Sequence, residues 1–273
     1  MGSRKSGIFL AIALAGLNSS CSTSNAPEPG TPPYYWAAAK ETFAANDYVK
    51  TGEHLDKIVA SDNEYTARAR PWLLILTAGT VRGYMEVADK LESGVREKKA
   101  DPGGFRKYIS NSRSTAGRLS LHFAETFMRF QKGKDDPVPL AFNFPSGSAT
   151  PVAELSKASV GMPLQATEIE GAQKRAVERA ILLETCRAAG APDDTAKALE
   201  LFKGGNVQVS RATFLVGMAD SLYQQAQLYD RKKMDDPEKL KVFSNLALTA
   251  LKDVPETKQT KELSDKIQKG MKK

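Results

Sequence analysis

The sequence predicts an all-α fold built from antiparallel helical hairpins. Over most of the chain, apolar residues recur at three- and four-residue steps, the spacing that places them on one face of a helix. No segment shows the alternating apolar and polar pattern of a half-buried strand over a useful length. Gly, Pro, Asn and Asp interrupt the helical pattern at intervals, and these breaks divide the chain into separate helices.

Residues 34–132 form the first group of predicted hairpins. Two short amphipathic helices come first, and Asn46 and Asp47 separate them and cap the second. Their inward-facing positions are Tyr35, Ala39, Phe43, Tyr48, Thr51, Leu55, Ile58 and Val59. The spacing thus predicts a hairpin at the start of the folded body.

A third helix is expected over residues 65–90, and Pro71 either begins it or kinks it. The Asp-Pro-Gly-Gly segment at 101–104 has the composition of a turn. Residues 105–132 then predict one or two further helices.

Residues 133–164 form a proline-rich segment that interrupts the helical pattern. A connection of this length is uncommon in a compact domain and is typically either functional or disordered. Its apolar residues argue against disorder: Leu140, Phe142, Phe144, Val152, Leu155, Val160 and Met162. We expect this loop to lie over a helical groove, with one short helical turn near 153–159.

Residues 165–273 form the second group of predicted hairpins. Asp193 or Asp194, Ser210 and Asp236 are suitable N-caps, and Pro237 suits a first helical turn. The expected helices are 165–189, 194–203, 210–231, 236–252 and 256–272.

The N-terminus, residues 1–20, has the layout of a secretory signal peptide. Arg4 and Lys5 precede an apolar run over 7–17 that is too short to remain as a membrane-spanning helix. Small residues and Cys21 follow. We therefore expect the chain to be exported.

Cys21 and its neighbouring serines resemble the processing site of bacterial lipoproteins. In that family the signal peptide is cut before the cysteine, which then carries acyl chains such as palmitate. Ser22 would, by the same resemblance, favour the periplasmic face of the outer membrane. An ordinary signal peptide followed by a chance cysteine is the alternative. The proline-rich remainder of 21–33 is expected to be a disordered tether between the lipid anchor and the folded body.

Charge and composition limit the possible functions. Removal of residues 1–20 leaves 37 basic and 32 acidic residues, a net charge of +5, and these alternate along most helices. Such mixing gives no reason to expect a nucleic-acid partner. Glu184 and Arg187 belong to this pattern and are expected on a solvated helix face.

His54 and His122 stand far apart, so no metal site or cofactor is expected. Cys186 is expected to be a small buried apolar residue of a helix.

The first hairpin resembles a tetratricopeptide repeat, with small residues at Ala39 and Thr51 and large ones at Phe43, Tyr48 and Leu55. Residues 219–255 show a weaker match to the same repeat pattern. This resemblance implies hairpins stacked as a short, irregular solenoid. A lipoprotein signal followed by such a body is distantly similar to the T-component lipoproteins of tripartite periplasmic transporters, and less so to helical lipoproteins of outer-membrane β-barrel assembly.

The aromatic residues supply the candidate binding site. A ligand cavity, if the protein has one, is expected between residues 105–132 and the second-half helices, roofed by 138–163. Its lining would come from Trp72, Phe123, Phe127, Phe130, Phe142 and Phe144. No catalytic motif is visible in the sequence.

The leading hypothesis is a membrane-anchored, non-catalytic protein-binding or scaffold module that engages another envelope protein. A transporter-associated lipoprotein with a small apolar ligand in an inter-helix cavity is the first alternative. A carboxylate-based hydrolase with dispersed catalytic residues is the second.

Overall fold

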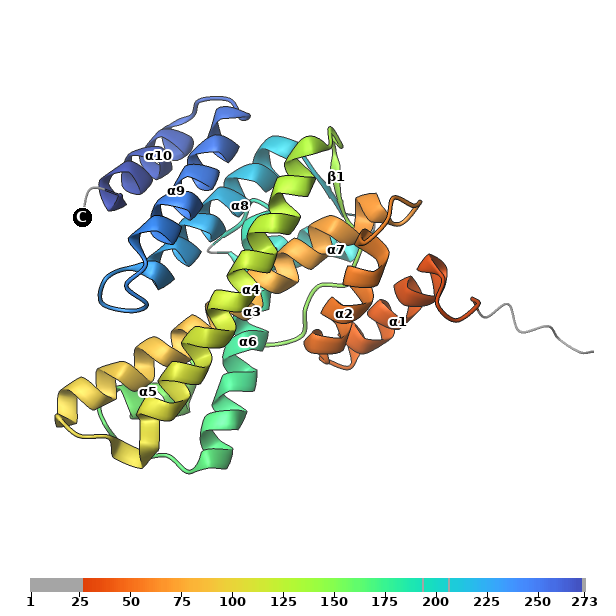
Figure 1. Ribbon diagram of the computed structural model, residues 1–273. Helices are drawn as coiled ribbons and strands as arrows, with labels where there is room; N and C mark the ends of the chain where they lie inside the picture. Colours follow the sequence, from red (N-terminus) through yellow and green to blue (C-terminus); the bar gives the residue numbers. More distant parts are fainter. Residues whose placement is uncertain (1–26, 193, 206, 272–273) are drawn as a thin grey trace, which may run out of the picture.

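The computed structural model describes residues 27–192, 194–205 and 207–271, and this part of the chain is almost entirely helical (Figure 1). The all-α prediction is confirmed. The expected signal peptide, the expected lipidation site at Cys21 and the start of the expected tether lie outside the described residues. The helices are α1 Pro32–Ala44, α2 Tyr48–Val59, α3 Thr66–Lys98, α4 Phe105–Lys132, α5 Ala153–Ser159, α6 Ala166–Ala188, α7 Thr195–Lys203, α8 Arg211–Ala226, α9 Pro237–Lys252 and α10 Lys258–Gly270, with 3-10 turns η1 Pro102–Gly104 and η2 Gln227–Tyr229 and strands β1 Val138–Leu140 and β2 Val207–Val209.

Helix α3 is the centre of the fold. It has 33 residues, and at 1.5 Å per residue this makes it about 50 Å long. Pro71 lies inside the helix, five residues after its first residue, Thr66. Helix α3 packs against α2, α4, α5, α6, α8 and β1. In a solenoid each repeat contacts only its neighbours, so these contacts with both halves of the chain do not confirm a tetratricopeptide-like stack.

Two glycines bring α3 and α6 close together. A Cβ atom at Gly79 would stand 2.6 Å from Ile181 Cα, and one at Gly83 would stand 2.6 Å from Val177 Cα. Gly217 of α8 approaches α6 in the same way, with the carbonyl oxygen of Arg187 3.0 Å from an added Cβ. Helix α6 is thereby held tightly between α3 and α8.

The segment 133–164 is ordered by contacts at both of its ends. Strand β1 pairs antiparallel with β2, with Val138 opposite Val209 and Leu140 opposite Val207. The expectation of no strands is corrected here, although each strand has only three residues. Helix α5 packs on α3 and α6. It occupies the position at which the sequence indicated a short helical turn.

Side-chain caps begin several helices as expected. Asp47, Asp194, Ser210 and Asp236 each accept a hydrogen bond from the backbone N–H three residues later. The predicted helix over 210–231 was too long, because α8 ends at Ala226 and a 3-10 turn follows. None of the helices in the described part of the chain has the length and apolar content needed to cross a bilayer.

Candidate functional site

Three of the six predicted aromatic residues come together at a surface cleft, which we call the aromatic cleft. Trp72 and Phe142 stack with ring centroids 5.3 Å apart, and Phe144 contacts Phe202, whose ring also lies 5.6 Å from Phe142. The cleft has a volume of about 810 Å³. The aromatic side chains of Trp36 and Phe43 also line the cleft.

The other three aromatic residues belong to the hydrophobic core. Phe123, Phe127 and Phe130 are almost fully buried. Phe123 stacks on Phe127, and Phe130 packs against Phe214 of α8. They are absent from the lining of the aromatic cleft. The structure therefore places three of the predicted residues at the aromatic cleft and three in the core. Strand β1 and the residues after it form one wall of the cleft.

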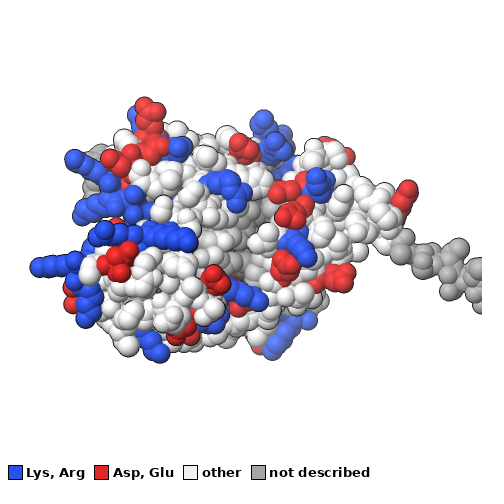
Figure 2. Space-filling model, turned by 60° about the horizontal axis from the view of Figure 1, so that its bottom comes forward, with Lys and Arg blue, Asp and Glu red and all other residues white. Residues whose placement is uncertain are grey.

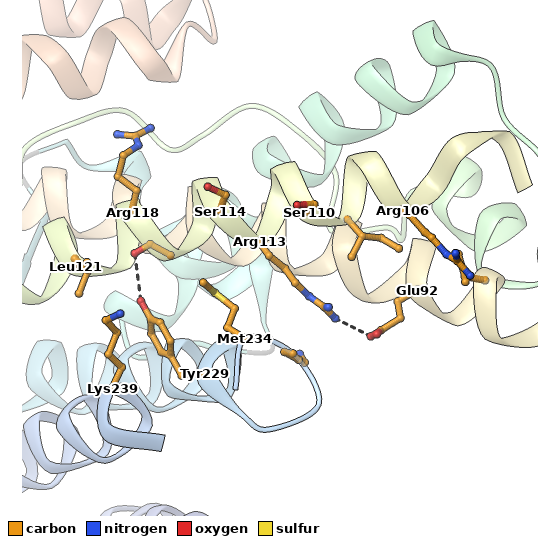
Figure 3. Close-up of a pocket in the computed structure, with 14 residues that line it drawn as sticks. Glu92, Arg106, Ser110, Arg113, Ser114, Arg118, Leu121, Tyr229, Met234 and Lys239 are labelled. Atoms are coloured by element: carbon orange, nitrogen blue, oxygen red, sulfur yellow. Dashed lines mark hydrogen bonds and ion pairs between the residues drawn. The ribbon is translucent and has the colours of Figure 1, made fainter. Parts of the chain in front are cut away.

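A second cleft, which we call the basic groove, lies between α4 and the connection from α8 to α9 (Figure 3). Its volume is about 590 Å³. Helix α3 closes one end through Glu92 and Val95. Five basic side chains and one acidic side chain line it. The basic ones are Arg106, Arg113, Arg118, Lys233 and Lys239.

Ion pairs neutralise part of this charge. Glu92 lies 2.7 Å from Arg113, and Lys233 lies 2.7 Å from Asp89 of α3. Lys239 pairs with its own N-cap, Asp236, at 2.8 Å. Within the described part of the chain, Arg106 and Arg118 make no ion pair. The groove therefore keeps an excess of positive charge.

Tyr229 and Met234 fix the wall of the basic groove against α4. The Tyr229 hydroxyl donates to the carbonyl oxygen of Gly117 at 3.2 Å and lies 2.6 Å from the Ser120 hydroxyl oxygen. Burial raises the pKa of Tyr229, so the hydroxyl stays protonated. The Met234 methyl group lies over Gly117, where an added Cβ would stand 3.2 Å from it. In Figure 3 both side chains point from the α8–α9 connection toward α4.

Two large apolar side chains of α4 are exposed, one inside the groove and one beyond it. Leu121 lines the groove, and Met128 follows two helical turns later; each is 43% exposed. Met234, at the opposite wall, is also partly exposed. Large exposed apolar side chains next to a charged groove are typical of an interaction surface. On the face shown in Figure 2, acidic and basic side chains are interspersed around a hollow of uncharged residues.

A buried charge cluster joins α3, α6 and α8. Glu184 of α6 is 1% exposed and accepts from Arg82 of α3 at 3.1 Å and from the Ser221 hydroxyl of α8 at 2.5 Å. Arg187 also bonds Glu184, and its Nε lies 2.8 Å from Asp220. The expectation that Glu184 and Arg187 lie on a solvated face was wrong. The close approaches at the α3, α6 and α8 glycines place these residues inside the fold.

The charge cluster keeps Glu184 ionised. Burial alone would raise its pKa, but Arg187, Arg82 and the hydrogen bond from Ser221 outweigh burial and lower the pKa below its usual value. A buried carboxylate held by two guanidinium groups is a charge-balanced structural unit. It is not positioned as a free general acid or base.

His122 has an acidic partner, and Cys186 is a buried free thiol. His122 of α4 lies 2.9 Å from the carboxylate of Asp56 in α2, and this hydrogen bond raises the His122 pKa. Cys186 is buried, which raises its pKa to about 11. Among the described residues, no group of three or more His, Cys, Asp or Glu side chains is arranged to hold a metal ion.

Sequence reasoning missed the basic groove and the charge cluster, since the residues of each are scattered along the chain. One signal was present for the cluster. Gly79 and Gly83 stand four residues apart inside a strongly helical pattern, where Gly costs about 1 kcal/mol relative to Ala. Such a pair indicates a close helix contact.

Comparison of the chain with protein-family models, curated proteins and solved structures found no match.

Proposed function

We propose that this protein is an exported lipoprotein whose helical body is a non-catalytic binding module for another envelope protein. The basic groove is the observation that carries the proposal. It combines an uncompensated positive charge at Arg106 and Arg118 with exposed apolar side chains at Leu121 and Met234. Charge complementarity then selects an acidic partner segment that also presents apolar residues, such as an amphipathic helix.

The position of the groove supports this proposal. Helix α1 lies at the right-hand edge of Figure 1, whereas α9 and the α3–α4 connection, which flank the groove, lie toward the left. The proposed anchor, Cys21, precedes α1 in the chain. The groove and the end that would carry the anchor therefore lie on different sides of the body, so a tether attached at α1 leaves the groove accessible to other envelope proteins.

Cross-linking in living cells tests the proposal. The full chain would be expressed with an affinity tag in a double-membraned bacterium, and cross-linked partners would be identified from the membrane fraction. We expect one specific partner, lost with Cys21→Ser and strongly reduced with the pair Arg106→Glu and Arg118→Glu. The matched control is Lys252→Glu with Lys261→Glu, two exposed lysines outside the groove.

Two results would refute the proposal. Equal partner recovery from the groove variant and its control would exclude the basic groove. A soluble Cys21→Ser protein that keeps the same partner, together with a wild-type protein that is equally soluble, would exclude the lipid anchor.

The aromatic cleft supports a second candidate, the binding of a small apolar ligand. Trp72 lines this cleft, is almost fully buried, and its indole N–H has no hydrogen-bond partner among the described residues. A ligand with an apolar body and one acceptor oxygen would complement this arrangement.

Intrinsic fluorescence can test the second candidate. Trp36 and Trp72 are the two tryptophans of the chain, and both line the cleft. A bound apolar probe such as anilinonaphthalene sulfonate should quench their emission by energy transfer, and Phe142→Ala should alter its affinity. Unchanged tryptophan emission at saturating probe would exclude this candidate.

A further inference from the structure

We propose that a third cleft, between α3, α6 and α8, binds a small neutral ligand that carries a peptide-type amide. We call it the amide cleft, and it is separate from the basic groove and the aromatic cleft. Its volume of about 520 Å³ lies in the range of small-molecule sites, roughly 300–1,000 Å³. Ala78, Met85 and Pro151 supply apolar surface to its lining.

Gln225 is the residue that points to a ligand. Gln225 is one of the residues that line the cleft, and it is only 2% exposed. Neither its amide nitrogen nor its amide oxygen has a hydrogen-bond partner among the described residues. Gln227, also in the lining, has an unpartnered amide nitrogen. Buried polar groups in proteins are nearly always hydrogen-bonded. An unpartnered donor and an unpartnered acceptor in one cleft therefore indicate that a bound molecule supplies the missing hydrogen bonds.

The neighbouring polar groups of the cleft already have partners. Ser221 donates to Glu184, and Gln224 donates to Asp220 at 3.0 Å. Arg179 donates to Glu86 and to the carbonyl oxygen of Ala149. Lys90 has no partner among the described residues either, but it is exposed to solvent. This leaves the amides of Gln225 and Gln227 as the buried groups of the cleft whose hydrogen-bonding capacity is unused.

The charges of the cleft select a neutral ligand. Three basic and three acidic side chains line it. Arg82 is bonded to Glu184, Arg179 to Glu86, and the remaining acid, Asp89, to Lys233. An added cation would find every carboxylate of the lining engaged. An added anion would meet only Lys90, which makes no ion pair among the described residues but is exposed to solvent. A ligand that offers one N–H and one C=O group matches Gln225, whose amide can both donate and accept.

The probe for this site is N-acetyl-alanyl-alanine amide, which is small, neutral and rich in amides. Saturation-transfer NMR on the full chain in detergent would measure its binding. We expect saturation transfer to the wild type and at least a tenfold weaker affinity for Gln225→Met, which removes the amide and keeps the length of the side chain. Gln173→Met, in a different surface groove, is the matched control and should bind as the wild type does.

Thermal unfolding of each variant would show whether a loss of binding is caused by a folding defect. Because Gln225→Met removes unpaired buried polar atoms, its Tm should equal or exceed that of the wild type. Met85→Trp, which narrows the cleft from α3, should also abolish binding. The proposal is overturned if the wild type shows no saturation transfer, if Gln225→Met and Met85→Trp bind like the control, or if the free-acid form of the probe binds as tightly as the amide.

Discussion

Replacing Glu184 with Gln tests whether the buried charge cluster stabilises the fold. The substitution keeps the shape of the side chain and removes its charge, and so leaves Arg82 without its carboxylate partner. Breaking a buried ion pair on one side costs about 3–5 kcal/mol. Since Arg187 keeps Asp220 and Arg82 is partly exposed, we expect the lower end, about 3 kcal/mol.

Calorimetry and urea unfolding would measure this effect. For a chain of this size each kcal/mol shifts Tm by about 2–4 °C, so Glu184→Gln should lower Tm by about 6–12 °C. Glu200→Gln is the control, because Glu200 pairs with Lys203 on the exposed surface of α7, where such pairs contribute about 0–1 kcal/mol.

The pH dependence gives a second check on the same substitution. The pKa of Glu184 is lowered in the folded protein. The stability that the ionised carboxylate contributes is therefore fully present above pH 4.5, the ordinary pKa of the group, and is lost as pH falls through the folded pKa. The stability gap between wild type and Glu184→Gln should therefore shrink in acid. A loss below about 1 kcal/mol at neutral pH, or a gap that does not change with pH, would refute the role assigned to the cluster.

Three further predictions concern helix packing, the aromatic cleft and pH. Gly79→Val should destabilise the protein by about 1–3 kcal/mol in urea unfolding, since its side chain would overlap the backbone of Ile181; an unchanged midpoint would show that α3 and α6 are not in close contact. Phe142→Ala should cost about 3–5 kcal/mol in calorimetry by leaving a cavity beside Trp72, and a smaller loss would mean that the cleft wall collapses to fill the space. The folded pKa of His122 is raised by Asp56, so the stability that this pair contributes is complete below pH 6.5 and is lost as pH rises through the folded pKa; His122→Gln should remove that slope from the stability profile, and NMR titration would locate the pKa directly.

Local patterns in the sequence predicted most of the helices. Caps such as Asp236 and breaks such as the Asp-Pro-Gly-Gly turn depend on neighbouring residues, so a single sequence can specify them. The helical turn at 153–159 was predicted for the same reason. The strands β1 and β2 were not, because each has three residues and gains its pairing from a segment far along the chain.

The candidate sites were less accessible to sequence reasoning. The basic groove gathers Glu92, Arg118 and Lys239 from three separate segments, and the spacing of charges along one helix does not indicate which of them meet. Glu184 followed the alternating charge pattern of an exposed helix face. Its burial depends on α3 and α8 crossing α6, and this is a property of tertiary packing.

The position of α3 has a consequence for the order in which the chain can fold during synthesis. Helices α1 to α4 are made first, yet the face of α3 that holds Arg82 is completed only by α6 and α8. Until α6 with Glu184 has been added, the first half of the chain exposes apolar surface of α3 and leaves Arg82 without its carboxylate partner. The nascent chain therefore stays incompletely folded until most of its length has emerged, and its apolar surface stays accessible to chaperones throughout that time.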